Sequence, residues 1–297
     1  MLQRIAELKK EKNAVILAHN YTCPELQDLA DHTGDSLELS RIASKTDADV
    51  IVFCGVHFMA ETAKILSPEK TVLIPDKNAG CPMADTITIE KLRLFKAMYP
   101  GVPVVAYVNT TAAIKSEVNV CCTSANAVNV VRNIDSDTVL FVPDRHLGAY
   151  IGRQIPEKKI ICWDGCCPVH NRILATDVIN KKKMYPGALV VAHPECPADV
   201  LELADIIAST SGMIREIKNS DKNEFIICTE RGLIHQFAKN SPEKSFINVN
   251  PVNVCPNMKK MTPEKLLHCL ETMTDEVVRE DSVIKNAAKA LERMILY

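Results

Sequence analysis

Short, almost entirely apolar runs alternate along this chain with longer stretches in which apolar residues recur at helical spacing. Segments 14–18 (AVILA) and 50–54 (VIVFC) contain no polar position, which is typical of strands buried on both faces of a parallel sheet. Segment 89–98 (IEKLRLFKAM) has the spacing of an amphipathic helix instead. Because helices follow strands through short connections, the pattern predicts right-handed βαβ units and an α/β fold.

The same order of features occurs three times. The opening strands end at Asn20, Asn109 and Glu195, which are 89 and 86 residues apart. Each repeat continues with a helix, a strand, a helix and a last strand-like run that closes on a Cys-Pro pair. This order predicts three homologous αβα units with parallel sheets and pseudo-threefold symmetry around a central site, rather than a chance recurrence of apolar runs. We expect the units at residues 1–83, 84–170 and 171–258, with a C-terminal helical segment at 259–297 that packs on them.

Composition narrows the classes of function. The chain has 297 residues, of which 47% are hydrophobic and 24% charged, as in an ordinary globular protein. Its net charge of -2 offers no basic surface for nucleic acid. No segment reaches the ~18 consecutive apolar residues of a membrane span, and the first residues form a charged amphipathic pattern without a signal-peptide core. We therefore expect a cytoplasmic protein that binds neither membrane nor nucleic acid.

The twelve cysteines indicate metal or redox chemistry, because disulfide scaffolds are usually short and secreted. No Cys-x-x-Cys spacing occurs, which argues against zinc ribbons, thioredoxin-like motifs and ferredoxins. A metal site would have to gather its ligands from distant segments.

Three cysteines hold the same place in the three repeats. Cys81, Cys167 and Cys255 each precede a proline and lie 86 and 88 residues apart. Three converging thiolates can hold an iron–sulfur cluster and leave one metal position open for Lewis-acid catalysis, and the alternative is that they are buried structural thiols. Other cysteines make the dipeptide less diagnostic, since Cys-Pro also occurs at Cys23 and Cys196, and Cys166 is adjacent to Cys167.

Polar side chains gather where the opening strands end. Ligands of parallel sheets bind beyond these carboxyl ends, so we expect a pocket with the thiolates on its floor and acid–base groups on its wall. Glu195 is the candidate general base. The candidate residues of this wall are His19 and Tyr21 in the first unit, Tyr107 and Asn109 in the second, and His193 and Glu195 in the third.

A hydroxyl residue begins a helix-like stretch in each unit, at Ser36, Ser124 and Thr210. Hydroxyls and backbone N–H groups at helix starts suit phosphate or carboxylate, although Ser and Thr also serve there as simple helix caps. His170, three residues after Cys167, has the spacing of a metal ligand. We favour a supporting role beside the cysteines for it.

These motifs resemble the quinolinate synthase family over essentially the whole chain. The resemblance is carried by AHNYTCPELQDLADHTGDS from Ala18, GVHFMAETAKIL from Gly55, CPMAD from Cys81, YVNTTA from Tyr107, TSANA from Thr123, PDRHLGAY from Pro143, CCPVH from Cys166, HPECP from His193, STSGM from Ser209 and CPNMKK from Cys255. One departure is Gly165-Cys166-Cys167-Pro168, where relatives often have Gly-His-Cys-Pro.

The resemblance implies an enzyme of NAD biosynthesis with a 4Fe-4S cluster, bound by Cys81, Cys167 and Cys255, whose fourth iron is open. Family members condense iminoaspartate with dihydroxyacetone phosphate to quinolinate, releasing phosphate and two waters. An oxidase or dehydrogenase that produces iminoaspartate is the implied functional partner. Matched to the family, the substrate site consists of His19, Ser36, Tyr107, Asn109, Ser124, His193, Glu195 and Thr210, with Tyr21 on a mobile segment that closes over it.

The hypothesis for catalysis assigns proton transfer to Glu195, assisted by His193, and proton donation to Tyr21 and Tyr107. Three alternatives remain at this point. They are an aconitase-like hydro-lyase acting on another small carboxylate, an iron–sulfur redox sensor, and a structural zinc protein that uses His170 beside the cysteines.

Overall fold

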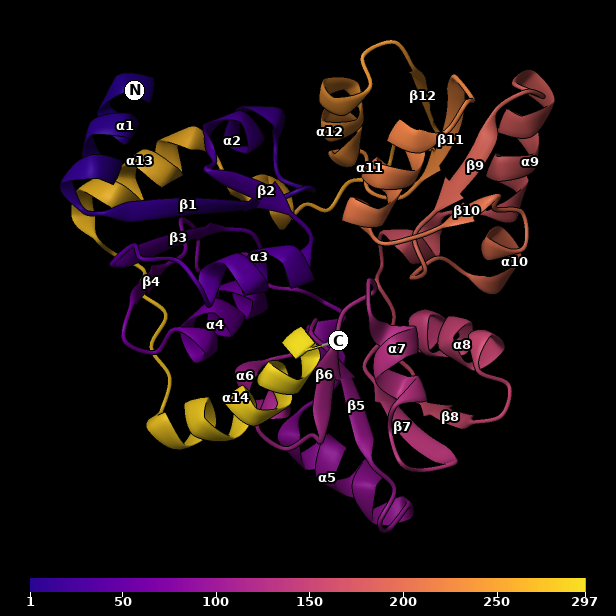
Figure 1. Ribbon diagram of the computed structural model, residues 1–297, viewed down its shortest axis with the longest axis horizontal. Helices are drawn as coiled ribbons and strands as arrows, with labels where there is room; N and C mark the ends of the chain where they lie inside the picture. Colours follow the sequence, from indigo (N-terminus) through magenta and orange to yellow (C-terminus); the bar gives the residue numbers. More distant parts are fainter. Residues whose placement is uncertain (297) are drawn as a thin grey trace.

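The computed structural model describes residues 1–296, which form three parallel sheets of four strands each. The sheets share one strand order, namely β2-β1-β3-β4, β6-β5-β7-β8 and β10-β9-β11-β12. Figure 1 shows them as three lobes around a common centre, each with helices packed on it. The predicted α/β class with three equivalent parallel-sheet units is confirmed.

Each unit contains four strands joined by helices. The first consists of β1 (Ala14–His19), α2 (Pro24–Leu29), β2 (His32–Gly34), α3 (Ser36–Ala43), β3 (Val50–Cys54), α4 (His57–Leu66) and β4 (Thr71–Leu73). The second consists of β5 (Val104–Tyr107), α6 (Ala112–Lys115), β6 (Val120–Cys122), α7 (Ala127–Arg132), β7 (Thr138–Val142), α8 (Arg145–Gln154) and β8 (Lys159–Cys162). The third consists of β9 (Leu189–Ala192), α10 (Ala198–Leu201), β10 (Ile206–Ile207), α11 (Thr210–Asn219), β11 (Glu224–Cys228), α12 (Leu233–Asn240) and β12 (Ser245–Asn248).

One strand and one short helix of every unit escaped the sequence pattern. We expected strand, helix, strand, helix, strand, but each sheet has an additional edge strand next to its opening strand. These strands are β2, β6 and β10, which span only two or three residues, and α2, α6 and α10 lead into them. Segments this short cannot display a period, so only the backbone pairing reveals them.

A helix precedes the opening strand of each unit: α1 (Leu2–Glu11), α5 (Ile89–Met98) and α9 (Ala175–Met184). The helix α13 (Pro263–Thr272) follows the third unit as α5 follows the first, but it returns to pack beside α1 (Figure 1). Residues 275–277 then pair with the edge strand β4, since Val277 N donates to Val72 O at 2.8 Å and Ile74 N to Asp275 O at 3.2 Å. The C-terminal segment therefore completes the first unit.

The last helix, α14 (Asp281–Leu296), lies between the first and second units. It packs against β6 and α6, and its final carbonyls accept hydrogen bonds from both units. Asn126 Nδ2 donates to Met294 O at 2.8 Å, and Arg41 Nη2 donates to Ile295 O at 3.1 Å. Helix α14 thus joins the two units beside the centre.

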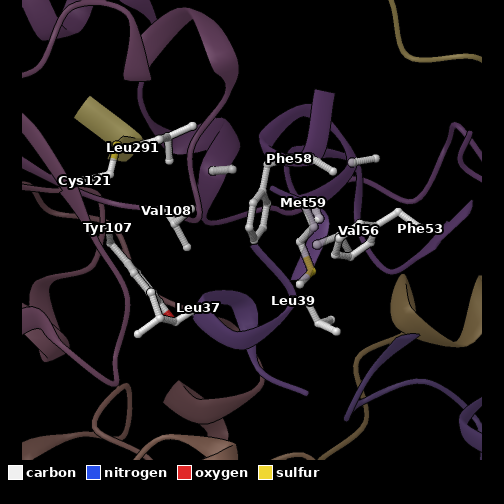
Figure 2. Packing of buried hydrophobic residues seen from close by; sticks show 14 of the residues in the cluster. Leu37, Leu39, Phe53, Val56, Phe58, Met59, Tyr107, Val108, Cys121 and Leu291 are labelled. Carbon is white, nitrogen blue, oxygen red and sulfur yellow. The ribbon is translucent and has the colours of Figure 1, made fainter. Parts of the chain in front are cut away.

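A continuous apolar core runs from the first unit into the second. Figure 2 shows part of it, including Phe58 and Met59 of α4 together with Tyr107 and Val108 at the end of β5. Burial of this surface stabilises the interface between units, as expected for units too small to bury a large core alone.

The third unit divides its side chains between two clusters. Phe225 and Ile227 of β11 join the common core, whereas Ile226 and Cys228 belong to a separate cluster on the other face of the sheet. This alternation follows from the two-residue period of a strand.

The carboxyl ends of the central strands meet at the centre of the molecule. In the order β2-β1-β3-β4, the strand that follows β1 in sequence lies on one side of it and the later strands lie on the other. Ligands of open parallel sheets bind where the strand order reverses in this way, here between β1 and β3. Among the described residues, none of the helices has the length and hydropathy that crossing a membrane requires.

Candidate functional site

A cavity of about 300 Å³ lies at these strand ends, between the three units. Every residue that the sequence singled out for the site lines it, so segments more than 200 residues apart in the chain converge there. These residues are Cys81, Cys167 and Cys255 together with His19, Tyr21, Ser36, Tyr107, Asn109, Ser124, His193, Glu195 and Thr210. Their roles stay predictions, but their convergence is a structural fact.

The three cysteines sit in the same local turn. Each follows the last strand of its sheet and precedes a short 3-10 helix at Ala84–Thr86, His170–Arg172 or Met258–Lys260. The residue four positions later donates its backbone N–H to the cysteine carbonyl, at 3.1 Å for Asp85, 2.9 Å for Asn171 and 3.3 Å for Lys259. The sequence repeat therefore reproduces one backbone geometry around each sulfur.

This geometry suits thiolate ligands of a metal centre. Backbone N–H groups within the turns lie against the sulfurs, for example those of Ala84 at Cys81 and Met258 at Cys255, and they stabilise negative charge there. Burial nevertheless raises the pKa of Cys81 to about 12 and also raises the pKa of Cys167 and Cys255. Such thiols ionise when a metal cation replaces the proton, so the donor set fits an iron–sulfur cluster.

The other cysteines lie outside this cavity. Cys166 is only partly buried, and the charged groups near it are Arg145, Asp144, Asp164 and Glu195. Cys23 and Cys196, the other two cysteines that precede a proline, do not reach the cavity either. All twelve cysteines fall within residues 1–296 and are unpaired.

His19 and His193 are equivalent in the first and third units. The backbone N–H two residues later donates to Nδ1 of each ring, at 3.1 Å from Tyr21 and 3.2 Å from Glu195. This contact assigns the remaining proton to Nε2, and Nε2 of His193 lies 3.2 Å from Ser124 Oγ. Burial lowers the pKa of both imidazoles to about 3, so they are neutral hydrogen-bond donors at physiological pH.

Glu195 is buried among hydrogen-bond donors. Its Oε1 accepts from the Tyr107 hydroxyl at 2.5 Å and lies 3.5 Å from Asn109 Nδ2, while Oε2 lies 2.8 Å from His170 Nδ1. Burial opposes ionisation of this carboxyl, but the adjacent His170 and the hydrogen bond from Tyr107 outweigh it and hold its pKa below the usual range. Burial and the charge of Glu195 raise the pKa of Tyr107, which therefore keeps its proton.

His170 is more central than the sequence indicated. Its ring is 1% exposed and stacks on His193 at a centroid distance of 4.8 Å, and Nδ1 lies 3.2 Å from Cys167 Sγ. Nε2 lies 2.8 Å from Thr229 Oγ1, which in turn lies 2.6 Å from the Tyr21 hydroxyl. A hydrogen-bonded chain thus connects Tyr21 to Glu195.

Thr229 was missed entirely, although a signal was present. It immediately follows β11, at a strand end like the other wall residues, but its unit already had His193 and Glu195 as candidates. Burial and the charge of Glu195 raise the pKa of Tyr21, so the phenol enters this chain in its protonated form.

The three hydroxyl residues lie on the cavity wall, but they do not cap helices. Asp35 Oδ1 caps α3 by accepting from Leu37 N and Glu38 N, and Ser209 Oγ caps α11 by accepting from Gly212 N. Ser36 and Thr210 are the first helical residues instead. Because the caps precede them, their hydroxyls are available to other partners; that of Thr210 accepts from Asn20 Nδ2 at 2.9 Å.

Ser124 lies further from its helix than expected. The sequence predicted a helix start there, but α7 begins at Ala127. Asn126 Oδ1 accepts from Thr123 N at 2.8 Å and folds the intervening residues into a turn. Asn109 Oδ1 is buried without a protein partner among the described residues, so it can accept a hydrogen bond from a bound molecule.

Acidification is expected to destabilise the protein through the two neutral histidines. Folded His19 and His193 have pKa values of about 3, so below pH ~6.5 the unfolded chain binds more protons than the folded one. Each histidine then costs roughly 1.4 kcal/mol per pH unit below ~6.5, or about 3 kcal/mol for the pair at pH ~5.5. Anaerobic urea unfolding at pH ~7.5 and ~5.5 measures this loss. The loss of unfolding free energy between the two pH values should be smaller by this amount in the His19→Gln, His193→Gln double variant. An equal loss in the variant and the unsubstituted protein would contradict the conclusion that both rings are buried and neutral.

Comparisons with known proteins agree with the motifs. A family model described as quinolinate synthetase A protein matches residues 3–296. Quinolinate synthase 1 of Methanosarcina acetivorans is 54% identical over 295 residues, which cover 99% of this chain and 97% of that protein. The quinolinate synthase of Dehalococcoides mccartyi strain CBDB1 is 54% identical over 98% of this chain and 96% of its own length. The quinolinate synthase of Thermodesulfovibrio yellowstonii is 51% identical over 99% of this chain and 97% of its own length.

Proposed function

Because the chain belongs to the quinolinate synthase family, we propose that it condenses iminoaspartate with dihydroxyacetone phosphate to quinolinate, releasing phosphate and two waters. The observation that carries the proposal is the convergence of three equivalent cysteines and nine polar side chains on one cavity. An enzyme that supplies iminoaspartate, an oxidase or a dehydrogenase, is the partner this reaction requires.

Cys81, Cys167 and Cys255 would hold a 4Fe-4S cluster. When bound, such a cluster supplies a Lewis-acidic iron that no cysteine occupies. A structural zinc ion would need the three cysteine sulfurs and His170 around one metal, but among the described residues only Cys167, His170 and Glu195 bring three ligand atoms within 4.8 Å of one another. The described residues therefore support an iron–sulfur centre better than a closed zinc site.

Neutral donors on the wall suit anionic substrates. Nε2 of His19 and His193 and the hydroxyls of Ser36, Ser124 and Thr210 would bind carboxylate or phosphate oxygens, and Asn109 would orient the substrate with its amide. The side chain of Glu195 contacts His170 and Tyr107, whereas that of His193 is directed at Ser124. We therefore assign His193 to substrate binding beside the base, and His170 to its support.

Glu195 would accept a proton from the substrate carbon or hydroxyl during tautomerisation. Tyr107 keeps its proton and donates it to Glu195 Oε1 across an oxygen–oxygen distance of 2.5 Å, and this hydroxyl would turn to donate to a developing oxyanion. Tyr21 would exchange a proton with substrate and restore its state through Thr229 and His170. Burial of the substrate in this cavity between the three units would keep water away from the reactive imine.

Anaerobically purified protein with full iron and sulfide content should form quinolinate when given dihydroxyacetone phosphate and iminoaspartate, the latter generated from oxaloacetate and ammonia. Each quinolinate should be accompanied by one phosphate, because condensation and phosphate loss belong to the same reaction. Product is measured by chromatography and phosphate by colorimetry. Hydration or dehydration of another carboxylate without quinolinate would favour the hydro-lyase. Cluster loss that alters only partner binding would favour the redox sensor.

A further inference from the structure

The backbone around Tyr21 is bound by side chains that anchor it to the third unit. Gln27 Nε2 donates to Asn20 O at 3.0 Å, to Thr22 O at 2.9 Å and to Gly232 O at 3.1 Å. Lys259 Nζ donates to the remaining carbonyl, that of Tyr21, and lies 3.5 Å from Thr22 O. All three carbonyls of residues 20–22 thus have partners that are themselves tied to the third unit.

Lys259 forms an ion pair with the completely buried carboxylate of Glu230. Its Nζ lies 3.0 Å from Oε1 and 3.2 Å from Oε2 of Glu230, whose side chain is 0% exposed. Glu230 also accepts the backbone N–H of Cys255 at 3.1 Å and that of Gly232 at 2.6 Å. One carboxylate therefore contacts both the loop of the third cysteine and the lysine that binds Tyr21.

The three repeats provide an internal comparison. The position four residues after the cysteine is Asp85 in the first unit, Asn171 in the second and Lys259 in the third, and the same backbone hydrogen bond forms in all of them. The turn itself therefore does not require lysine. Among the described residues, only the third of these turns hydrogen-bonds the backbone of Tyr21, and only that turn has a lysine at this position.

We propose that Lys259, held by Glu230, is a positioning residue that fixes the backbone of Tyr21 relative to the Cys255 loop. Because the backbone of Tyr21 is fixed in this way, its hydroxyl is aligned with Thr229 Oγ1, 2.6 Å away. The inference rests on the proposed function only for the catalytic role of Tyr21. The contact between the two loops is independent of the reaction.

The first test measures backbone protection. In the anaerobic holoprotein, Lys259→Met should speed amide hydrogen exchange at residues 20–22 by about tenfold or more, because a charged donor to their carbonyls is lost. Lys239→Met is the matched control, since Lys239 also joins the third unit to the first, through Asp28 at 3.0 Å, without touching residues 20–22. Equal exchange in the two variants would overturn the proposal whether or not the protein makes quinolinate.

The second test asks whether Lys259 acts through Tyr21. Lys259→Met should lower kcat by roughly tenfold to a hundredfold with little change in KM, because Lys259 does not touch the cavity. In a Tyr21→Phe background the same substitution should change kcat by less than about twofold, since the hydroxyl it positions is gone. Independent, multiplicative losses would contradict a positioning role. If the unsubstituted protein makes no quinolinate but the exchange result holds, the proposed function fails and the positioning contact stands.

A third variant separates the two functions of Glu230. In Glu230→Gln one carboxylate oxygen becomes an NH₂ group, which cannot accept a hydrogen bond. The side chain therefore loses its hydrogen bond from either Cys255 N or Gly232 N. Iron release to a chelator should therefore accelerate by about tenfold in Glu230→Gln but remain normal in Lys259→Met. Normal iron release in both variants would remove Glu230 from the support of the Cys255 loop.

Discussion

Replacing Cys81, Cys167 or Cys255 by alanine is expected to abolish the iron–sulfur chromophore and to lower quinolinate formation by more than about 10³-fold. The three sulfurs line one cavity from three separate units. Removal of any one of them therefore leaves only two thiolates, too few to hold the cluster. Each variant should fold, because the turn around the cysteine is made by backbone hydrogen bonds. Anaerobic absorbance, with iron and sulfide analysis, measures the first effect.

Cys166→Ala is the matched control for Cys167→Ala. The two residues are adjacent, but Cys166 does not line the cavity, so its variant should retain both cluster and activity. A full complement of iron in any one of the three alanine variants would remove that cysteine from the ligand set. Loss of the cluster in Cys166→Ala would instead show that the neighbouring thiol takes part.

Glu195→Gln should retain the cluster and bind substrate, but kcat should fall by roughly 10²- to 10⁴-fold, the usual contribution of a general base. The amide has nearly the same shape and still accepts from the Tyr107 hydroxyl, so the cavity should keep its form. It cannot carry the negative charge that His170 and the Tyr107 hydroxyl stabilise against burial. Single-turnover formation of quinolinate measures the chemical step.

Glu202→Gln is a suitable control for this change. Glu202 lies in the same unit, outside the cavity, and its side chain is 71% exposed beside Arg153. Its variant should have normal kinetics. Near-normal turnover of Glu195→Gln would remove that residue as the obligate base and shift attention to Tyr21 and His170.

The sequence predicted the architecture because the same order of strands and helices occurs three times along the chain. Continuous apolar runs such as Val50–Cys54 have no solvent face, and that alone requires helices on both sides of a parallel sheet. The short edge strands could not be predicted, since β10 consists of only two residues. Their pairing depends on backbone contacts with β9 that leave no periodic signal.

The candidate site was predicted as a set of residues but not as a network. Strand ends, the starts of helix-like stretches and the Cys-Pro repeat identified every lining residue that we proposed, because topology brings these positions together. The partners of Glu195 could not be predicted, since His170 and Tyr107 both reach it from the second unit, whereas Glu195 lies in the third. Thr229 stands at a strand end like the other wall residues, but its role and that of Lys259 become evident only from their contacts, at 2.6 Å with the Tyr21 hydroxyl and 3.0 Å with Glu230.

The return of the chain to its first unit has a consequence for synthesis on the ribosome. The β4 edge and the surface beneath α13 acquire their partners only when residues 263–277 emerge, near the end of translation. Until then the nascent first unit exposes an unpaired strand edge, which is a template for aggregation. Chaperone protection of the growing polypeptide should therefore matter most for the part of the protein that is made first.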